Sequence, residues 1–358
     1  IIITVPTPVN DDRTPNLSFV ESAMKSAIMS ITTKITPVIV LESTVFPGVT
    51  RDIAQEICKD AGLTIGEDFD IAYSPERVSP GELGRSAGEV PRIVGSDNEK
   101  TGEMLADLYS SITNGGCTYV GNIEVAEAAK LIENTQRDID IAFVNELANV
   151  MPLVGVDAMD ALRAAATKWN FHFHRPGIGV GGHCIPVDPY YYIQMSNENL
   201  WPSIISPAAR EINSKMPSNS ASKVLSLVEE NVNSALILGY SYKPEVGDTR
   251  ETPVREFTRQ LSSEIDHLYV WDPLVDSEEE YPPWVDSIDD PFSSIDTIDI
   301  VILATGHRDC IELDWRKLIG KCKSGILYDG PRSLERSEME QIGWRYFGTG
   351  SVIGEKNG

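Results

Sequence analysis

The sequence predicts an α/β protein in which two doubly wound domains are joined by a long central helix. Three observations support this fold class. Short apolar runs alternate with amphipathic helical stretches in the first and last thirds of the chain, which is typical of parallel sheets covered on both faces. A stretch of about thirty residues between these parts keeps helical periodicity throughout. We find no internal repeat that would indicate a different architecture.

The first third alternates strands with helices from its first residue onward. Runs such as Val38–Leu41 are apolar at every position, as in a strand buried inside a sheet. The first helix has Asn16 or Ser18 as its expected cap. We expect strands at 1–5, 37–43, 70–74 and 117–120, and helices at 18–32, 48–61 and 98–111. Together they form a Rossmann-like domain over residues 1–122.

The middle of the chain is helical. Apolar residues recur at threes and fours from 124 to 154, which gives a helix of roughly 45 Å. A helix of that length usually links domains or packs against a partner subunit. We expect a shorter helix at 157–167, a loop at 170–189, and a helix at 206–230 with a break at Pro217. Residues 123–232 then form a central helical domain.

The last third begins a second α/β series, with strands expected at 235–239, 267–271, 298–304 and 325–328. The acidic stretch 276–290 is predicted to be a solvated loop. This second Rossmann-like domain covers residues 233–358. A ligand is expected where two such domains are joined.

Composition limits the partners of this protein. The chain has 30 basic and 54 acidic residues, a net charge of −24, which disfavours nucleic acid as a ligand. An acidic substrate would therefore need a few local cations. No run approaches the roughly 20 apolar residues of a membrane span, and no signal peptide is visible. Five widely spaced cysteines indicate neither a disulfide framework nor a zinc site, so we expect a reducing cytoplasm.

The strongest chemical signal is a glycine-rich loop that ends in a cysteine. Four glycines between 177 and 182 precede His183 and Cys184, and Asp188 lies four residues beyond the cysteine. Glycines allow a close approach of the backbone and present N–H groups, which would activate Cys184 as a nucleophile. The alternative is a surface loop with an inert cysteine. A dinucleotide fingerprint is disfavoured because no strand precedes these glycines.

Two further signals lie on expected elements. Lys130 and Asn134 are spaced i, i+4 on the long helix, so both face one side and could hold an oxyanion. The alternative is a solvated helix face. Glu76 follows a strand directly and could act as an acid, a base or a hydrogen-bond acceptor.

His172 and His174 form an H-x-H pair, but a zinc site needs three or four convergent ligands, so no metal is expected.

Taken together, these motifs resemble the UDP-glucose/GDP-mannose dehydrogenase family over essentially the whole chain. The matching segments, in order, are Val-Pro-Thr-Pro at 5–8, Glu-Ser-Thr-Val at 42–45, Ser-Pro-Glu-Arg at 74–77, Glu-Ala-Ala-Lys-Leu-Ile-Glu-Asn at 127–134, Gly-Gly-His-Cys-Ile-Pro-Val-Asp at 181–188, Leu-Gly-Tyr-Ser-Tyr-Lys at 238–243, Asp-Thr-Arg-Glu-Thr-Pro at 248–253 and Val-Trp-Asp-Pro at 270–273. The resemblance implies an NAD-linked, two-step, four-electron oxidation of the C6 alcohol of a nucleotide sugar. It also implies a homodimer built on the central helix.

The resemblance assigns roles to individual residues. Cys184 would attack the intermediate aldehyde and carry a thioester that water hydrolyses. Lys130 would steady developing oxyanions with Asn134 beside it, and Asp188 and Thr44 would position the water or base. The remaining implied contacts are Pro6, Thr7, Ser43, Thr44 and Glu76 with NAD, and Arg77, Lys130, Asn134, Gly179, Gly181, Gly182, Lys243 and Arg250 with the UDP-sugar.

Two features depart from the family pattern. The family's first strand, G-x-G-x-x-G turn and helix would precede Ile1 and do not occur in this sequence, so we expect the first domain to be N-terminally incomplete and the chain to bind NAD weakly. Pro80 stands where the UDP-glucose branch has a second glutamate. This form resembles the UDP-N-acetylhexosamine dehydrogenases, with Arg77 either donating to the N-acetyl carbonyl or serving as a structural ion-pair partner. Oxidation of UDP-glucose or GDP-mannose, and a non-catalytic fragment that only binds nucleotide sugar, are the alternatives.

Overall fold

A computed structural model describes residues 1–32, 36–78, 81, 88–228, 232–276 and 281–353. The chain divides into two compact units, which are considered separately. The first unit comprises Ile1–Arg137 and Val187–Ser206, and the second comprises Asp138–Pro186 and Pro207–Gly358. Pro80, on which the expected substrate preference partly rests, lies outside the described residues.

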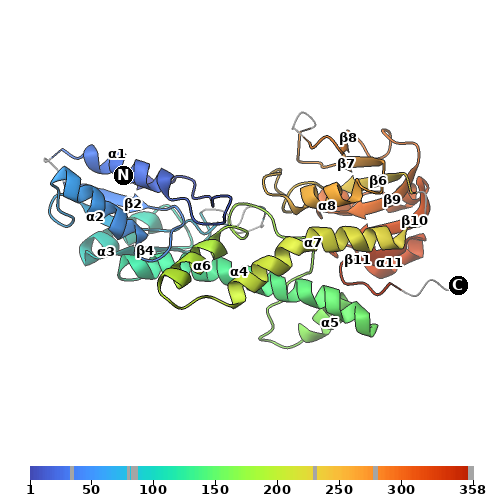
Figure 1. The fold of residues 1–358 in the computed structure, drawn as a ribbon, viewed down its shortest axis with the longest axis horizontal. Coiled ribbons are helices and arrows are strands. Elements are labelled where there is room, and N and C mark those ends of the chain that lie inside the picture. Colours follow the sequence, from blue (N-terminus) through green and yellow to red (C-terminus); the bar gives the residue numbers. More distant parts are fainter. Residues whose placement is uncertain (33–35, 79–80, 82–87, 229–231, 277–280, 354–358) are drawn as a thin grey trace. The chain divides into compact units, whose positions relative to one another are not determined.

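The first unit is built on a sheet with the strand order β1-β2-β3-β4-β5 (Figure 1). Its strands are β1 (Ile2–Ile3), β2 (Val38–Leu41), β3 (Asp70–Tyr73), β4 (Arg92–Ser96) and β5 (Cys117–Tyr119). Its first helices are α1 (Ser18–Met29), α2 (Val49–Ala61) and α3 (Glu99–Ser110). The predicted α/β order is confirmed. Strand β4 was not predicted, because its apolar run, Ile93 and Val94, is too short to stand out in the sequence.

The two faces of this sheet bury alternate residues of the same strands. Ile39 and Leu41 of β2 pack with helices α1 and α2, whereas Val40 between them packs with α3. This period of two is what a strand covered on both faces requires. Three of the four strand pairings are parallel, but β3 and β4 pair antiparallel, so the sheet is mixed.

Four α-helices and one 3₁₀ turn form the described middle of the chain. Helix α4 (Ile123–Val150) runs straight into a 3₁₀ turn (Met151–Val154), and Asp157 caps α5 (Ala158–Ala165) through the Met159 amide. Helix α6 (Asp188–Glu198) was expected to be loop at its start; Pro189 at its second position favours helix initiation there. The predicted break at Pro217 is wrong, because α7 (Ile205–Leu227) continues through it. One lost hydrogen bond is tolerated in this packed helix, and the Pro217 ring lies where a side chain on Gly179 would be.

The second unit contains a six-stranded sheet with the order β11-β10-β9-β6-β7-β8. Its strands are β6 (Ser234–Leu238), β7 (His267–Trp271), β8 (Asp286–Ser287), β9 (Ile298–Leu303), β10 (Cys322–Asp329) and β11 (Arg345–Gly348), and all described pairings are parallel. Helices α8 (Pro253–Leu261), α9 (Arg308–Ile311), α10 (Trp315–Ile319) and α11 (Arg336–Ile342) connect them. The chain leaves β6 toward one edge and β9 toward the other, so the doubly wound topology is confirmed and a switch point lies between these strands.

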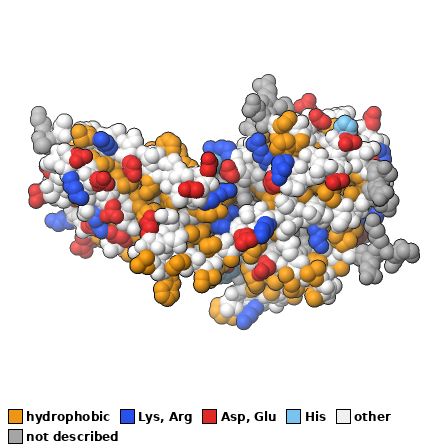
Figure 2. All heavy atoms as spheres, viewed as in Figure 1, with side chains coloured by type: hydrophobic (Ala, Val, Ile, Leu, Met, Phe, Trp, Pro, Cys, Tyr) orange, Lys and Arg blue, Asp and Glu red, His pale blue; other side chains and the backbone are white. Residues whose placement is uncertain are grey.

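The acidic surplus is spread over the surface. On the face shown in Figure 2, acidic side chains are scattered over both units, with basic side chains among them. By length and apolar composition, no single helix in the described part of the chain is suited to span a membrane; only the bent pair Ile123–Val154 and Ala158–Ala165, at 119°, meets those criteria together.

Candidate active site

In the first unit, three of the predicted catalytic side chains meet around a fourth, the buried carboxylate of Asp188. Asp188, the first residue of α6, is only 2% exposed. Asn134 donates to its Oδ2 at 2.5 Å, Thr44 hydrogen-bonds to it from the end of β2, and the charge of Lys130 acts on it. Burial outweighs these three stabilising contacts and raises the pKa of Asp188 to about 6. A carboxylate with this pKa is ionised at neutral pH but can take up a proton, as a general base requires.

Lys130 is held by the loop that follows β3. Lys130 is 8% exposed, and its ammonium donates to the main-chain carbonyl of Glu76. The Glu76 side chain folds back on the same loop, where its Oε1 accepts from the Arg77 and Val78 amides at 2.7 Å each. Its Oε2 accepts from Arg92 at 2.9 Å. Glu76 therefore shapes the loop that positions Lys130.

Arg92 is a site residue that the sequence interpretation missed. It begins β4 and forms ion pairs with Glu76 and Glu42, both at 2.9 Å, while its guanidinium lies 4.5 Å from the centre of the Tyr109 ring. Tyr109 donates to Glu42 at 2.5 Å. Because β4 itself was not expected, no local pattern could have placed this arginine beside two acidic residues from other strands.

Arg77 is engaged by the protein's own groups. Its guanidinium forms a two-pronged ion pair with Glu133 of α4, at 2.6 and 3.1 Å, and donates to the Pro91 carbonyl at 2.9 Å. Of the two roles considered for Arg77, these contacts correspond to that of a structural ion-pair partner. It ties the loop after β3 to the helix that carries Lys130 and Asn134.

Four of the five residues expected to contact NAD lie beyond the carboxyl ends of β1 and β2, and the fifth, Glu76, follows β3. Ser43 donates to the Val5 carbonyl at 2.7 Å, and Thr7 hydrogen-bonds to Tyr191 of α6. Pro6 is in the same loop. Ser43 and Thr44 do not cap α2, because Gly48 occupies the cap position with φ +100°. The buried Glu127 instead accepts the first amides of α2, including that of Gly48 at 2.7 Å.

In the second unit, Cys184 lies exposed at the end of the glycine-rich loop. The close approach that the glycines allow is to the protein's own chain. A Cβ on Gly182, whose φ is +89°, would lie 2.6 Å from the Tyr242 ring, and one on Gly181 would lie 2.6 Å from the Glu251 carbonyl. A Cβ on Gly179 would be 2.7 Å from Pro253. The structure thus places these three glycines against the loop after β6 and the start of α8.

That neighbouring loop carries the predicted cations of the nucleotide subsite. Lys243 follows β6 at the switch point of the second sheet, and Arg250 is seven residues beyond. Arg250 donates to both oxygens of Asp248, at 3.0 and 2.8 Å, and its side chain remains 71% exposed. Asp248 also contacts the His183 ring at 3.3 Å, directly beside Cys184. Hydrogen bonds from Arg250 hold the pKa of Asp248 far below its usual range.

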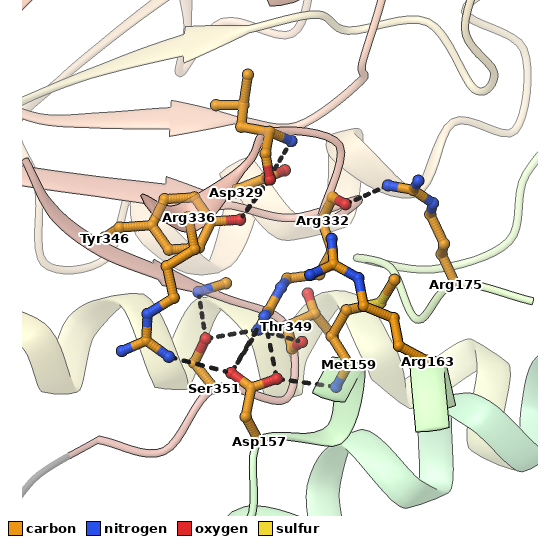
Figure 3. A network of polar contacts seen from close by, with 12 residues as sticks. Asp157, Met159, Arg163, Arg175, Asp329, Arg332, Arg336, Tyr346, Thr349 and Ser351 are labelled. Carbon is orange, nitrogen blue, oxygen red and sulfur yellow. Dashed lines mark hydrogen bonds and ion pairs between the residues drawn. The ribbon is translucent and has the colours of Figure 1, made fainter. Parts of the chain in front are cut away.

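The start of the loop is fastened to a polar network in the same unit (Figure 3). Arg175 donates to the carbonyl of Arg332. Arg332 is 4% exposed and forms a bidentate ion pair with Asp157, at 3.0 and 3.1 Å, while also donating to Ser351 at 2.6 Å. Arg332 therefore links the cap of α5 to the segment after β11 through its guanidinium, and it accepts from Arg175 through its main-chain carbonyl.

His172 and His174 point to Asp140, at 3.9 and 3.7 Å. Within the described ranges, no group of three His, Cys, Asp or Glu side chains is arranged to hold a metal ion.

Three family models match the chain, each from the UDP-glucose/GDP-mannose dehydrogenase family. The NAD-binding domain matches residues 1–113, the central domain 124–215 and the UDP-binding domain 236–336. The UDP-N-acetyl-D-glucosamine 6-dehydrogenase of Salmonella typhi is 35% identical over 92% of this chain and 78% of its own length.

Solved structures agree with these matches. The UDP-D-ManNAc dehydrogenase of Pyrococcus horikoshii superposes with a TM-score of 0.83 at 29% identity, covering 98% of this chain and 81% of that one. The NDP-N-acetyl-D-galactosaminuronic acid dehydrogenase of Methanosarcina mazei Go1 gives a TM-score of 0.81 at 26% identity, covering 98% and 77% respectively.

Proposed function

The chain belongs to the UDP-glucose/GDP-mannose dehydrogenase family, and from this premise we propose that it oxidises the C6 alcohol of a UDP-N-acetylhexosamine to a carboxylate with NAD. The observation that carries the proposal is the buried cluster of Asp188 with Asn134, Thr44 and Lys130. It unites an acid whose pKa is raised to about 6 with a cation and two hydrogen-bonding side chains. Such a group is suited to removing a proton from an alcohol or from water.

The residues at the carboxyl ends of β1 and β2 fit a nicotinamide cofactor. Thr7 and Thr44 are half-buried and offer hydroxyls at the edge where parallel sheets bind nucleotides. Pro6, Ser43 and Glu76 belong to the same set of loops. When bound there, NAD would supply the acceptor for hydride.

The chain's own residues divide the remaining work. Asp188 accepts the proton of the alcohol, and loss of hydride from C6 leaves an aldehyde. The Cys184 thiolate then adds to the aldehyde carbon, and Lys130 with Asn134 stabilises the oxyanion formed. Loss of a second hydride leaves a thioester on Cys184. After Asp188 has released the first proton to solvent, it deprotonates water, which cleaves the carbon–sulfur bond and releases the carboxylate and the thiol.

In the second unit, the diphosphate of the substrate would be bound by Lys243 and Arg250. Arg250 is exposed and carries a planar fork of donors suited to phosphate oxygens. Its partner Asp248 keeps the fork oriented before the anion arrives. Local cations of this kind are needed in a protein with a net charge of −24.

The preference for an N-acetylated sugar is supported by the relatives whose names specify UDP-N-acetylglucosamine and UDP-N-acetylmannosamine. The test is kcat/KM of the full protein for these two sugars and for UDP-glucose, at one salt concentration. We expect either N-acetylated substrate to be used more efficiently, with two NADH formed for each uronate. Equal efficiency with UDP-glucose would overturn the preference, and absence of NADH with every nucleotide sugar would overturn the oxidation itself.

We also propose a homodimer formed through the central helix. Helix α4 and the 3₁₀ turn after it carry large apolar side chains that are strongly exposed: Ile132 60%, Phe143 53%, Leu153 80% and Val154 69%. Apolar surface of this kind marks association sites. Light scattering should give the mass of a dimer, and Phe143→Glu should shift it toward the monomer. Met29→Glu, which changes an equally exposed apolar residue on α1, is the control.

A further inference from the structure

Cys184 lies on a segment that is poorly suited to hold its own position. Four glycines precede it between Gly177 and Gly182, and glycine loses more conformational freedom on ordering than any other residue. Cys184 is exposed, so it is not fixed by burial in a core. A nucleophile displaced by about 1 Å can lose about 100-fold in rate. The position of Cys184 therefore has to be set by groups outside the loop.

A buried polar network in the second unit provides such groups. Helix α4 contributes Asp138 and Asn145, and helix α7 contributes Arg210 and Asn213, none of them more than 6% exposed. Asp138 Oδ1 accepts from Arg210 and from Asn213, both at 2.7 Å. Asn213 Oδ1 accepts from Asn145 at 2.9 Å. We call these four residues the loop anchor.

The loop anchor reaches both ends of the segment that carries the nucleophile. At one end, the Gly177 amide donates to Asn145 Oδ1 at 3.0 Å. At the other, Arg210 donates to the carbonyl of Ile185 at 3.3 Å, one residue after Cys184. A single connected set of hydrogen bonds therefore closes the loop at Gly177 and Ile185.

The direction of every hydrogen bond in the loop anchor is determined. The Gly177 amide can only donate, so the Asn145 oxygen must face it and the Asn145 nitrogen must face Asn213. The Asn213 nitrogen then faces Asp138, whose carboxylate and carbonyl oxygens can only accept. A chain fixed at both ends leaves no alternative amide orientation, so it transmits a defined geometry.

Stability alone does not account for this arrangement. Asp138 is 0% exposed, burial raises its pKa, and its Oδ2 has no hydrogen-bond partner within the described part of the chain. Replacing a buried ion pair with apolar residues of similar volume is often neutral or stabilising. A network that is costly to bury and yet connects both ends of one loop is better explained by the position it imposes.

We propose that Asp138, Asn145, Arg210 and Asn213 are positioning residues that hold Cys184 where the aldehyde forms. The inference rests on the proposed function, because it assigns the loop anchor to the steps in which the thiol takes part. Oxidation of the alcohol to the aldehyde precedes addition of the thiol. Displacing Cys184 should therefore impair the second oxidation and leave the first largely intact.

The test separates the two oxidations in the full protein. The double variant Asp138→Leu with Arg210→Met removes the buried charges together and leaves no unpaired ion. Under single-turnover conditions, wild type should form two NADH for each UDP-N-acetylhexosamine. The double variant should form the first at a rate within about 3-fold of wild type and the second about 100-fold more slowly, with the aldehyde captured by a hydrazine.

The matched control is Asn149→Leu. Asn149 belongs to α4 and donates to the Met216 sulfur and the Asn145 carbonyl, and among the described residues no hydrogen bond joins its side chain to the loop. Both oxidations should proceed normally in this variant. A double variant that slows both oxidations equally, or neither, overturns the positioning role. Wild type forming no NADH at all would instead refute the proposed function.

A milder variant covers the case in which the double variant does not fold. Arg210→Lys keeps a positive charge opposite Asp138 but replaces the planar fork with a single ammonium group. It should slow the second oxidation by about 10-fold and leave KM for the UDP-sugar and the first oxidation unchanged. Unchanged rates of both steps in a folded Arg210→Lys protein would count against the proposal.

Discussion

Each of the two units places an aspartate beside groups assigned to catalysis or substrate binding. The pKa values of these two aspartates are shifted in opposite directions. Asp188 in the first unit is 2% exposed, and burial raises its pKa to about 6 despite hydrogen bonds from Asn134 and Thr44. Asp248 in the second unit has a side chain 19% exposed, and a two-pronged contact with Arg250 holds its pKa far below the usual range. One carboxylate can exchange a proton near neutral pH, whereas the other is a permanent anion.

The difference shows that solvent access, more than the number of hydrogen bonds, separates a proton carrier from a structural anchor. Both carboxylates accept hydrogen bonds and both lie close to a positive charge. Desolvation dominates for Asp188, and charge-assisted hydrogen bonding dominates for Asp248. Four variants test this difference between the two units, and they are given from the largest expected effect to the smallest.

The largest effect is expected from Cys184→Ser in the second unit. A serine hydroxyl is a far weaker nucleophile than a thiolate, so overall oxidation to the acid should fall by at least about 1000-fold. Uronate formation would be measured by chromatography. Cys117→Ser, at a half-buried cysteine of the first unit, is the control and should stay active. Wild-type turnover in the Cys184 variant would exclude a covalent mechanism.

The next effect is expected from Asp188→Asn. Loss of the base should lower kcat by about 10² to 10⁴. The wild-type rate should fall as the pH drops through about 6, since the ionised form of Asp188 is then lost, and the variant should lack this limb. A pH–rate profile of both proteins tests this, and an unchanged acidic limb in the variant would assign it to another group.

Asp188→Asn should lower kcat but should not lower the thermal stability of the protein. The folded pKa of Asp188 lies above its ordinary value of 3.8, so its protonated form favours folding and this contribution is lost as the pH rises through about 6. Above that pH, Asp188→Asn removes a buried charge and should leave Tm equal to or higher than that of wild type.

A smaller effect is expected from Arg250→Ala. Removing one charge-assisted contact to a phosphate should raise KM for the UDP-sugar by about 10- to 100-fold with little change in kcat. If Arg250 contacts the nucleotide part of the substrate, titration with UDP alone should show the same loss of affinity, about 10- to 100-fold. Arg259→Ala, which breaks the exposed contact with Glu256 in the same domain, should bind UDP normally.

The smallest effect is expected from Arg77→Met in the first unit. The ion pair with Glu133 is partly exposed, so its loss should cost about 0.2–1 kcal/mol of unfolding free energy. If Arg77 is structural, the ratio of kcat/KM between UDP-N-acetylglucosamine and UDP-glucose should stay within about 3-fold of wild type. A collapse of that ratio would restore Arg77 as a contact to the N-acetyl group.

The parts of the fold and site that could be predicted are those set by local sequence. The i, i+4 spacing of Lys130 and Asn134 sufficed to place both on one helix face, and the structure brings Asn134 to Asp188. Apolar runs sufficed to place most strands of both sheets. Arg92 could not be placed beside Glu42 and Glu76, and the contact of Asp248 with His183 could not be foreseen, because these partners are distant in the chain and no local spacing records such contacts.

The glycine-rich loop shows the same limit. Its composition predicted a close approach of the backbone to a ligand, and that contact stays a prediction. The close neighbours in the structure are the protein's own Tyr242 and Glu251, which lie in a distant part of the sequence. Composition can reveal that space is tight, but not what fills it.

Helix α4 fixes the spacing of the residues that are assigned to catalysis and to positioning. Lys130, Asn134, Asp138 and Asn145 all belong to this one uninterrupted helix and, at about 100° per residue, fall within an arc of about 80°. A single inserted or deleted residue between Lys130 and Asn145 would rotate one part of that stripe by about 100° against the other. Length variation should therefore be tolerated in the loops of this protein long before it is tolerated in that one segment of helix.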